Sequence, residues 1–296
     1  MGVTDTRWSL ARWVRPLGWA TLVANIMLVV TGGAVRLTGS GLGCPTWPRC
    51  TEESFRPHGE LTLHAAIEFG NRMLTFVLVA IAVATFVSAW QTGRRELRRL
   101  SIILALGIPA QAVIGGITVL TDLNPWIVSF HLLCSMAIIG LAVLFLRRID
   151  HPHPQRAARG LVGLAWLTFA AAWVVLYIGT VVTGSGPHAG DLESKRNELD
   201  PLQVSQLHAD SVFLFFGLSV GLLFALIAVG ASHEARRAVV VLLAVSFSQG
   251  AIGFVQYFTD LPEILVGFHM LGAALVSATV TWTLLLVLDG RTSKPA

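Results

Sequence analysis

Charged residues are scarce in this sequence. Asp, Glu, Lys and Arg make up 13% of its 296 residues, whereas hydrophobic residues make up 54%, and the mean hydropathy is +0.69. Soluble domains carry about 25% charged residues, so this composition excludes an ordinary soluble domain and indicates a membrane protein embedded in lipid. The net charge of +4 reflects where the basic residues fall along the chain and gives no case for nucleic-acid binding.

Cysteine and intramembrane proline are also rare. No cluster rich in cysteine or histidine supplies four ligands at the usual spacings, so zinc is the weaker alternative for any bound metal. Pro109 is the one proline well inside an apolar run, which argues against a transporter with broken helices. Cys134 is expected to serve packing. Cys44 and Cys50 lie in GCPTWPRC on the expected outer side, where a disulfide is favoured and two free thiols are the alternative.

Eight apolar runs are long enough to cross a membrane, since about 20 residues span a hydrocarbon core of about 30 Å. They cover residues 17–36, 64–90, 100–120, 127–147, 160–183, 205–230, 237–258 and 264–288. The sequence thus predicts an all-α membrane protein with eight transmembrane helices.

Basic residues gather on one side of these runs, which predicts that both termini are cytoplasmic. They are Arg7, Arg12 and Arg15, then Arg94, Arg95, Arg98 and Arg99, then Arg147, Arg148, Arg156 and Arg159, then Arg236 and Arg237, and finally Arg291 and Lys294.

The second half of the sequence repeats the first. Gln111, TDL at 121–123 and FH at 130–131 recur with one common offset at Gln249, 259–261 and 268–269, and TGSG at 38–41 recurs at 183–186. An even number of helices per unit keeps both copies in the same orientation. We therefore expect two four-helix bundles, residues 1–150 and 151–296, related by a pseudo-two-fold axis along the membrane normal.

Four histidines are expected at one depth, within about two turns of the outer ends of the even-numbered runs. They are His64, His131, His208 and His269, whereas histidines 58, 151, 153, 188 and 233 fall in expected loops. Ionisable groups inside a membrane helix point to a functional site, although a single one could simply satisfy an interior hydrogen bond. Two imidazoles from facing helices can hold haem iron, and His208 with His269 forms such a pair.

The first half offers fewer ligands. His131 corresponds to His269. The spacing between His208 and His269, counted back from His131, leads to Asn71 or its neighbour and not to a histidine. His64, Glu68 and Asn71 share one stripe of a helix, with Arg72 one step round. We expect a six-coordinate haem that passes electrons in the half with two histidines. The half with one histidine and a carboxylate leaves room for a substrate and for proton chemistry.

Several motifs, in order, resemble haem A synthase of the type with a cysteine pair in its first outer loop. They are VVTGGAVRLTGSGLGCPTWPRC, IEFGNR, FHLL, LHADSVFLF and FHML. The resemblance covers all eight runs; RLTGSGLGC followed by IEF-x-x-R is specific, whereas FH alone is not. It implies two pseudo-symmetric four-helix bundles that oxidise a ring methyl of haem O to a formyl, giving haem A for cytochrome oxidase assembly. It further implies a location in the cell membrane and haem O synthase as a partner, and it leaves a homo-oligomer open.

The resemblance also implies roles for individual residues. His208 and His269 match the ligands of a bound haem b, and His131 matches a ligand position for the substrate haem. Glu68 matches a glutamate proposed to act in catalysis, for which an ion pair with Arg72 is the structural alternative. Cys44 and Cys50 match the loop pair.

Asn71 departs from the family pattern, which is Glu-x-x-His-Arg where this chain has Glu-x-x-Asn-Arg. An amide oxygen is a weak iron ligand beside imidazole. We therefore expect His131 alone to hold the substrate haem. His64, about 10 Å further out along the helix, is then placed near a propionate or in proton transfer, and ligation by His64 is the alternative. Arg72 and Arg36 could pair with haem propionates, although Arg36 could equally reach the outer interface.

Two rival functions remain. A dihaem membrane electron carrier, or a quinol-linked cytochrome b-like subunit, would want four good axial ligands, and this sequence offers three in the expected register. A transporter ranks last, because the polar layer lies near one surface rather than at the middle of the membrane.

Overall fold

The computed structural model describes residues 10–57, 62–150, 159–191 and 193–290. Their helices confirm the predicted fold class, since eight of them are long and apolar enough to cross a membrane. The helices are α1 (Val14–Leu37, preceded by the short η2, Leu10–Trp13), α2 (Leu63–Gln91), α3 (Arg95–Leu120), α4 (Pro125–Asp150), α5 (Arg159–Ser185), α6 (Pro201–Ala228), α7 (His233–Phe258) and α8 (Glu263–Leu288).

A few residues used in the topology argument lie outside the described part of the chain. They are Arg7, Arg156, Arg291 and Lys294, together with the loop histidines His58, His151 and His153.

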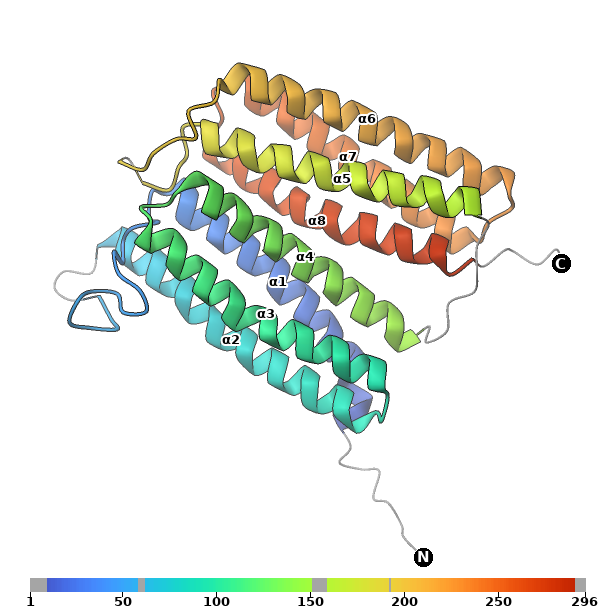
Figure 1. The fold of residues 1–296 in the computed structure, drawn as a ribbon, viewed down its shortest axis with the longest axis horizontal. Coiled ribbons are helices and arrows are strands. Elements are labelled where there is room, and N and C mark those ends of the chain that lie inside the picture. The colour runs from blue at the N-terminus through green and yellow to red at the C-terminus, as the bar shows by residue number, and fades with distance from the viewer. Residues whose placement is uncertain (1–9, 58–61, 151–158, 192, 291–296) are drawn as a thin grey trace, which may run out of the picture.

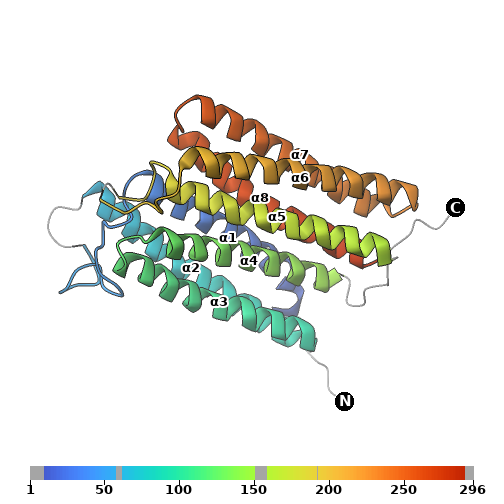
Figure 2. The same ribbon diagram turned by 45° about the horizontal axis from the view of Figure 1, so that its top comes forward.

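Consecutive helices run in opposite directions, so all even-numbered helices begin at the same end of the molecule (Figure 1). Helices α1 to α4 form one group and α5 to α8 a second group beside it, an arrangement that is also visible after rotation (Figure 2). We call the end where α2, α4, α6 and α8 begin the histidine end, and the other end the opposite end.

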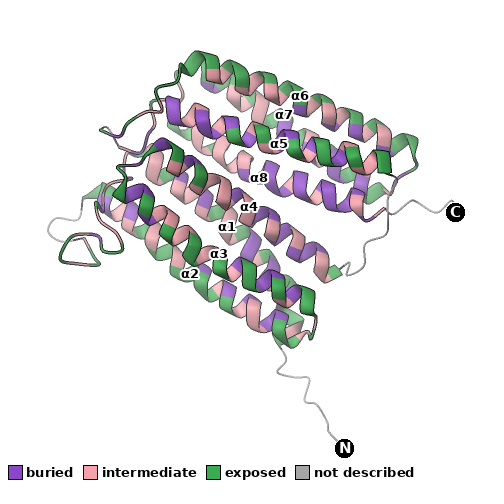
Figure 3. Cartoon of the chain, viewed as in Figure 1, coloured by how far each residue is buried: buried purple, intermediate pink, exposed green. Residues whose placement is uncertain are grey.

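The two groups meet mainly through α4 and α8. The hydroxyl of Ser277 on α8 donates a hydrogen bond to the carbonyl oxygen of Met136 on α4 at 2.8 Å. Gly140 on α4 faces Thr281. Helix α8 is 61% buried along its membrane window, more than any other helix, and buried residues gather along this contact (Figure 3). Small residues here let the two backbones approach closely, as in other membrane helix pairs.

The TDL turns have the same backbone conformation in both halves. Asp122 and Leu123 between α3 and α4, and Asp260 and Leu261 between α7 and α8, all have φ between 52° and 57°. Each leucine donates its backbone N–H to a carbonyl oxygen of the preceding helix, Leu123 to Thr118 at 2.8 Å and Leu261 to Gln256 at 3.0 Å. The match supports the predicted repeat; the symmetry axis itself stays a prediction.

A cluster of ionised groups joins the helices at the opposite end. Arg147 of α4 is buried and pairs with Asp289, which follows α8, and with Glu234 at the start of α7 at 3.2 Å. The next residue, Arg148, pairs with Glu96 of α3 at 2.8 Å. These contacts lock the ends of α4 and α8 together.

Candidate functional site

The site begins with two histidines of the second group that face each other. His208 on α6 and His269 on α8 have ring centroids 6.4 Å apart with an angle of 74° between the ring planes. Both lie about two turns from the starts of their helices, and α6 and α8 both pack against α5 and α7. Imidazole–metal bonds are about 2.0–2.1 Å long, so this separation has room for one metal atom between two ring nitrogens.

The surroundings of these rings also suit axial ligands. The Nδ1 atoms of His131 and His269 are buried and have no hydrogen-bond partner within the described ranges, whereas the His208 ring also interacts with the backbone of Val175 on α5. Buried polar atoms are normally paired, so the unpaired imidazole nitrogens of His131 and His269 call for a binding partner. Among the described residues, no group of three or more His, Cys, Asp or Glu side chains is arranged to hold a metal ion. The set therefore fits haem, which needs two axial ligands at most, better than zinc.

Each of these three rings packs edge-on against a glycine of the preceding helix. An ideal Cβ would lie 3.3 Å from Cε1 of His131 at Gly115, 3.1 Å from that of His208 at Gly179, and 3.7 Å from that of His269 at Gly253. The glycines thus leave space for the rings. Sequence reasoning missed them, although Gly115 and Gly253 have the same offset as the two matched glutamines.

His131 is the corresponding histidine of the first group. Gln111 on α3 donates through Nε2 to the hydroxyl of Ser135 at 3.0 Å and to the backbone carbonyl oxygen of His131 at 3.3 Å. These bonds join α3 to α4 at the turn that carries the ring. Gln111 therefore links α3 to α4 beside the His131 ring.

A comparison of the buried residues of α2 and α6 shows which residue of α2 corresponds to His208. Helix α6 buries four side chains, which are Phe215, Ser219, Leu222 and Leu226. One common offset links them to buried residues of α2, namely Leu78, Ala82, Thr85 and Ala89. The same offset pairs His208 with Asn71. The burial pattern therefore supports the register in which Asn71 takes the place of a histidine.

Asn71 is held by α1. Its Oδ1 atom accepts a hydrogen bond from the hydroxyl of Thr31 at 2.8 Å. Thr31 was not singled out by sequence reasoning, because a threonine in an apolar helix usually bonds only its own helix backbone.

Glu68 and Arg72 hold the first outer loop to α2. Glu68 is 5% exposed; its Oε2 accepts from the backbone N–H of Cys44 at 2.6 Å and its Oε1 from Arg72 at 2.5 Å. Arg72 also donates to the carbonyl oxygens of Cys44, Thr46 and Arg49. The ion pair, the structural alternative for Glu68, is thus present, and all of these guanidinium contacts are within the protein.

The loop itself is closed by a disulfide between Cys44 and Cys50, as predicted. Trp47, between the two cysteines, places its ring against Gly116 of α3, where any Cβ would collide with it. Gly116 follows the glycine that supports the His131 ring. The loop therefore covers the histidine end of the first group.

The remaining polar residues of this end contact loops. His64 is exposed in the first turn of α2, and its Nδ1 lies 3.0 Å from the hydroxyl of Ser40. Arg36 donates to the carbonyl oxygens of Thr183 and His188 at 2.9 and 2.6 Å, which joins α1 to the last turn of α5 and to the segment after it. The roles that the sequence suggests for His64, near a propionate or in proton transfer, and for Arg36, at a propionate, stay predictions.

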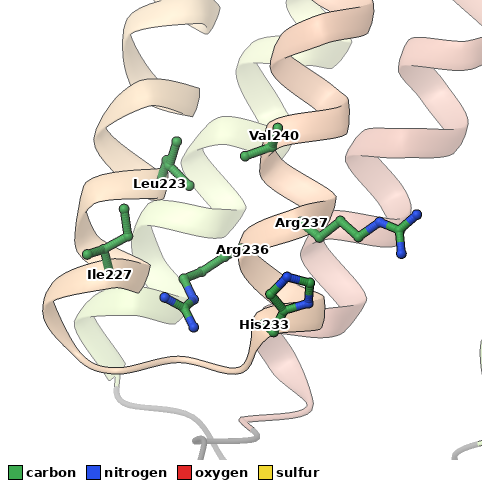
Figure 4. Close-up of a pocket in the computed structure, with 6 residues that line it drawn as sticks. All are labelled: Leu223, Ile227, His233, Arg236, Arg237 and Val240. Atoms are coloured by element: carbon green, nitrogen blue, oxygen red, sulfur yellow. The ribbon is translucent and has the colours of Figure 1, made fainter.

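A surface pocket between α6 and α7 lies far from this site. It is at the opposite end and is lined by Leu223, Ile227, His233, Arg236, Arg237 and Val240 (Figure 4). Its apolar wall and two arginines provide no facing pair of ligands, so the histidine end carries the candidate site.

Comparisons with known proteins agree with this geometry. The family model described as cytochrome oxidase assembly protein, COX15-CtaA, matches residues 15–66 and 58–190. A protein named heme A synthase from Listeria monocytogenes is 31% identical over 176 residues, 55% of this chain and 57% of the relative. One from Lysinibacillus sphaericus is 32% identical over 182 residues, 57% of this chain and 58% of the relative. One from Staphylococcus epidermidis is 24% identical over 293 residues, 92% of this chain and 96% of the relative.

The chain thus spans somewhat more than half the length of the first two relatives and nearly all of the third. The family match covers all of the first group and α5. The chain belongs to the COX15-CtaA family of cytochrome oxidase assembly proteins.

Proposed function

We propose that this chain is a haem A synthase, which oxidises a ring methyl of haem O to a formyl for cytochrome oxidase assembly. The facing pair of His208 and His269 is the observation that carries the proposal, together with the heme A synthase relatives. In the overall change the methyl carbon loses two hydrogens, gains one oxygen and gives up four electrons. The site must therefore hold a redox group beside the substrate.

In this proposal His208 and His269 hold a haem b in the second group. Haem iron with two axial imidazoles supplies one-electron transfer when bound. The glycines beside the rings, above all Gly179, fix their orientation.

His131 holds the substrate haem in the first group, and Glu68 accepts protons released from it. The Glu68 carboxylate is held in place for this role by the Arg72 guanidinium at 2.5 Å and by the backbone N–H of Cys44 at 2.6 Å. The disulfide loop limits the access of water from the outer side, since it packs over α2 and α3. Residues 1–150 are thereby the substrate half and residues 151–296 the electron-transfer half.

We also place the protein in the plasma membrane with both termini in the cytoplasm. The arginines at the opposite end, Arg94, Arg95, Arg98 and Arg99 among them, support this orientation. Haem O synthase is the proposed source of the substrate. A homo-oligomer is compatible with the many apolar side chains that face outward.

The test is to express this chain in cells that also make haem O and to extract their haems. A chromatogram with haem A supports the proposal, and one with haem O alone contradicts it. The rival dihaem carrier predicts unchanged haem O. That rival lacks support at Asn71, which stands where it needs a fourth imidazole.

Glu68→Gln separates catalysis from binding. The amide keeps an acceptor for the Cys44 N–H but removes the charge, so we expect the haem b spectrum to persist and haem A output to fall by about 100-fold or more. Full haem A output from this variant would leave Glu68 with a structural role only.

A further inference from the structure

The two groups of helices differ at one of the two residue positions that could supply a ligand to haem iron. Helices α6 and α8 each supply a histidine to the second group. In the first group α4 supplies His131, and the matching place on α2 is taken by Asn71, by the register of the buried faces. Asn71 is half-buried, and its amide oxygen is bonded to Thr31 of α1.

Asn71 is poorly placed to act as a ligand itself. Its oxygen is the one atom of the side chain with lone pairs to offer a metal. One of its two lone pairs already accepts from Thr31 on α1 at 2.8 Å, and an amide oxygen is a weak iron ligand beside imidazole. The NH2 group of the same amide is a donor and has no lone pair to give. The side chain can therefore present hydrogen-bond donors to the site without coordinating a metal.

His64 does not replace the missing imidazole. It lies in the first turn of α2, about 10 Å along the helix from Asn71, and its ring is exposed with Nδ1 engaged by Ser40 at 3.0 Å. To reach the level of Asn71, the ring would have to leave the loop contact and pass Glu68, whose carboxylate is fixed by Cys44 and Arg72.

We propose that iron held by His131 keeps an open axial position on the side of Asn71, and that this position admits a water-sized or diatomic ligand with the Asn71 amide as hydrogen-bond donor. The proposal rests on the binding of haem O in the first group, as proposed above. The second group has no such position, because His208 and His269 fill both sides. Small exogenous ligands are thus admitted only beside the substrate.

The test uses carbon monoxide as a probe of the full-length protein, purified with its haems and reduced. A six-coordinate haem with two imidazoles does not bind carbon monoxide readily, whereas a five-coordinate one does. We expect about one CO-reactive haem and about one unreactive low-spin haem per chain in the absorption spectrum. A protein whose haems all fail to react overturns the proposal, and so does one without haem in the first group.

A reciprocal exchange sharpens the result. Asn71→His supplies the missing imidazole, so the CO-reactive fraction should fall at least about tenfold while the low-spin signal rises. His208→Asn copies the arrangement of the first group into the second, so the CO-reactive fraction should rise to about two haems per chain. If Asn71→His fails to accumulate, His208→Asn still decides, because unchanged CO reactivity there contradicts the proposed effect of the amide.

Two further variants separate the role of Asn71 from that of His64. Asn71→Leu removes the amide without adding a ligand; CO binding should persist, with a shifted C–O stretching frequency, and an unshifted frequency overturns the donor role. His64→Ala should leave the CO-reactive fraction unchanged, and a gain of CO reactivity would identify His64 as the ligand.

Haem extraction from the same samples keeps the two proposals apart, since CO reactivity without haem A removes the synthase activity but not the open position.

Discussion

The absence of a side chain at Gly179 determines how the His208 imidazole is held. Gly179 leaves a gap that the His208 ring fills, and a Cβ there would come within 3.1 Å of Cε1. Real Cβ atoms rarely have contacts this short, so a side chain at this position must move the ring. At Gly253 the corresponding distance is 3.7 Å, an ordinary contact.

Gly179→Ala should therefore displace the His208 ring and weaken haem retention in the second group by about tenfold. The helix itself should gain stability, because alanine favours helix over glycine by about 1 kcal/mol. The measurement is the low-spin haem absorbance per protein after purification. Gly253→Ala is the matched control and should retain the absorbance; equal losses in both variants would contradict this account.

His208→Ala and His269→Ala should each abolish the low-spin haem b spectrum, because either change removes one of two facing ligands. The comparison is with His233→Ala, a histidine at the opposite end. A spectrum retained in both ligand variants would remove the assignment.

The histidines and Asn71 could be predicted, and the glycines could not. An imidazole or amide in an apolar run is conspicuous, and the repeat shows which positions correspond. Glycine occurs 28 times in the sequence, and nothing local distinguishes Gly179 from the rest. Its role arises from a contact between α5 and α6, which depends on how the helices are rotated against each other.

Helix α2 shows how a polar stripe can serve a loop as well as a site. Sequence reasoning placed Glu68 and Arg72 on the interior face and offered both a bound group and an ion pair. The structure has the ion pair, and it adds the loop carbonyl oxygens of Cys44, Thr46 and Arg49. These contacts join residues distant in sequence, so no periodicity could reveal them.

Arg72→Met should release the loop at 44–50 from α2. It leaves Glu68 without its cation and several carbonyl oxygens without a donor, at a cost of about 1–3 kcal/mol. Hydrogen exchange of the loop amides, above all that of Cys44, should accelerate. Arg49→Met is the control, since the guanidinium of this exposed arginine donates to the carbonyl oxygen of nearby Glu52 and not to α2. Equally fast exchange of the loop amides in that variant would contradict the anchoring role of Arg72.

The extent of the helices was predicted well except where their first turns are polar. The apolar run 205–230 begins after the start of α6, because Pro201 opens the helix and Asp200 caps it by accepting from the N–H of Leu202. Likewise Ser232 caps α7 by accepting from the N–H of Ala235, ahead of the run 237–258. Hydropathy registers apolar residues and misses such caps.

The contact between α4 and α8 holds the two groups of helices together, and ionised side chains lie at one end of it. Arg147 and Asp289 have side chains that are 6% and 4% exposed. Removing one member of such a buried pair leaves an uncompensated charge. No sequence pattern indicated this pairing, because the positive-inside rule assigns Arg147 to a cytoplasmic surface and not to a partner.

Arg147→Met should therefore lower the stability of the protein by about 3–5 kcal/mol, measured as the thermal midpoint in detergent. Arg15→Met should change it by at most about 1 kcal/mol, since the Arg15–Asp150 pair is 3.5 Å long and well exposed. Similar effects of the two substitutions would show that the buried cluster does not join the two groups.

The contact between α4 and α8 also brings the histidines of the two groups onto neighbouring helices. Ser277 and Met136 bring α4 and α8 into contact, and helices packed in this way lie about 8–10 Å apart. His131 and His269 stand on these two neighbours at matching heights. If each half held the haem proposed for it, the two groups would lie on either side of the α4–α8 contact, and electrons would pass between the halves without a mobile carrier.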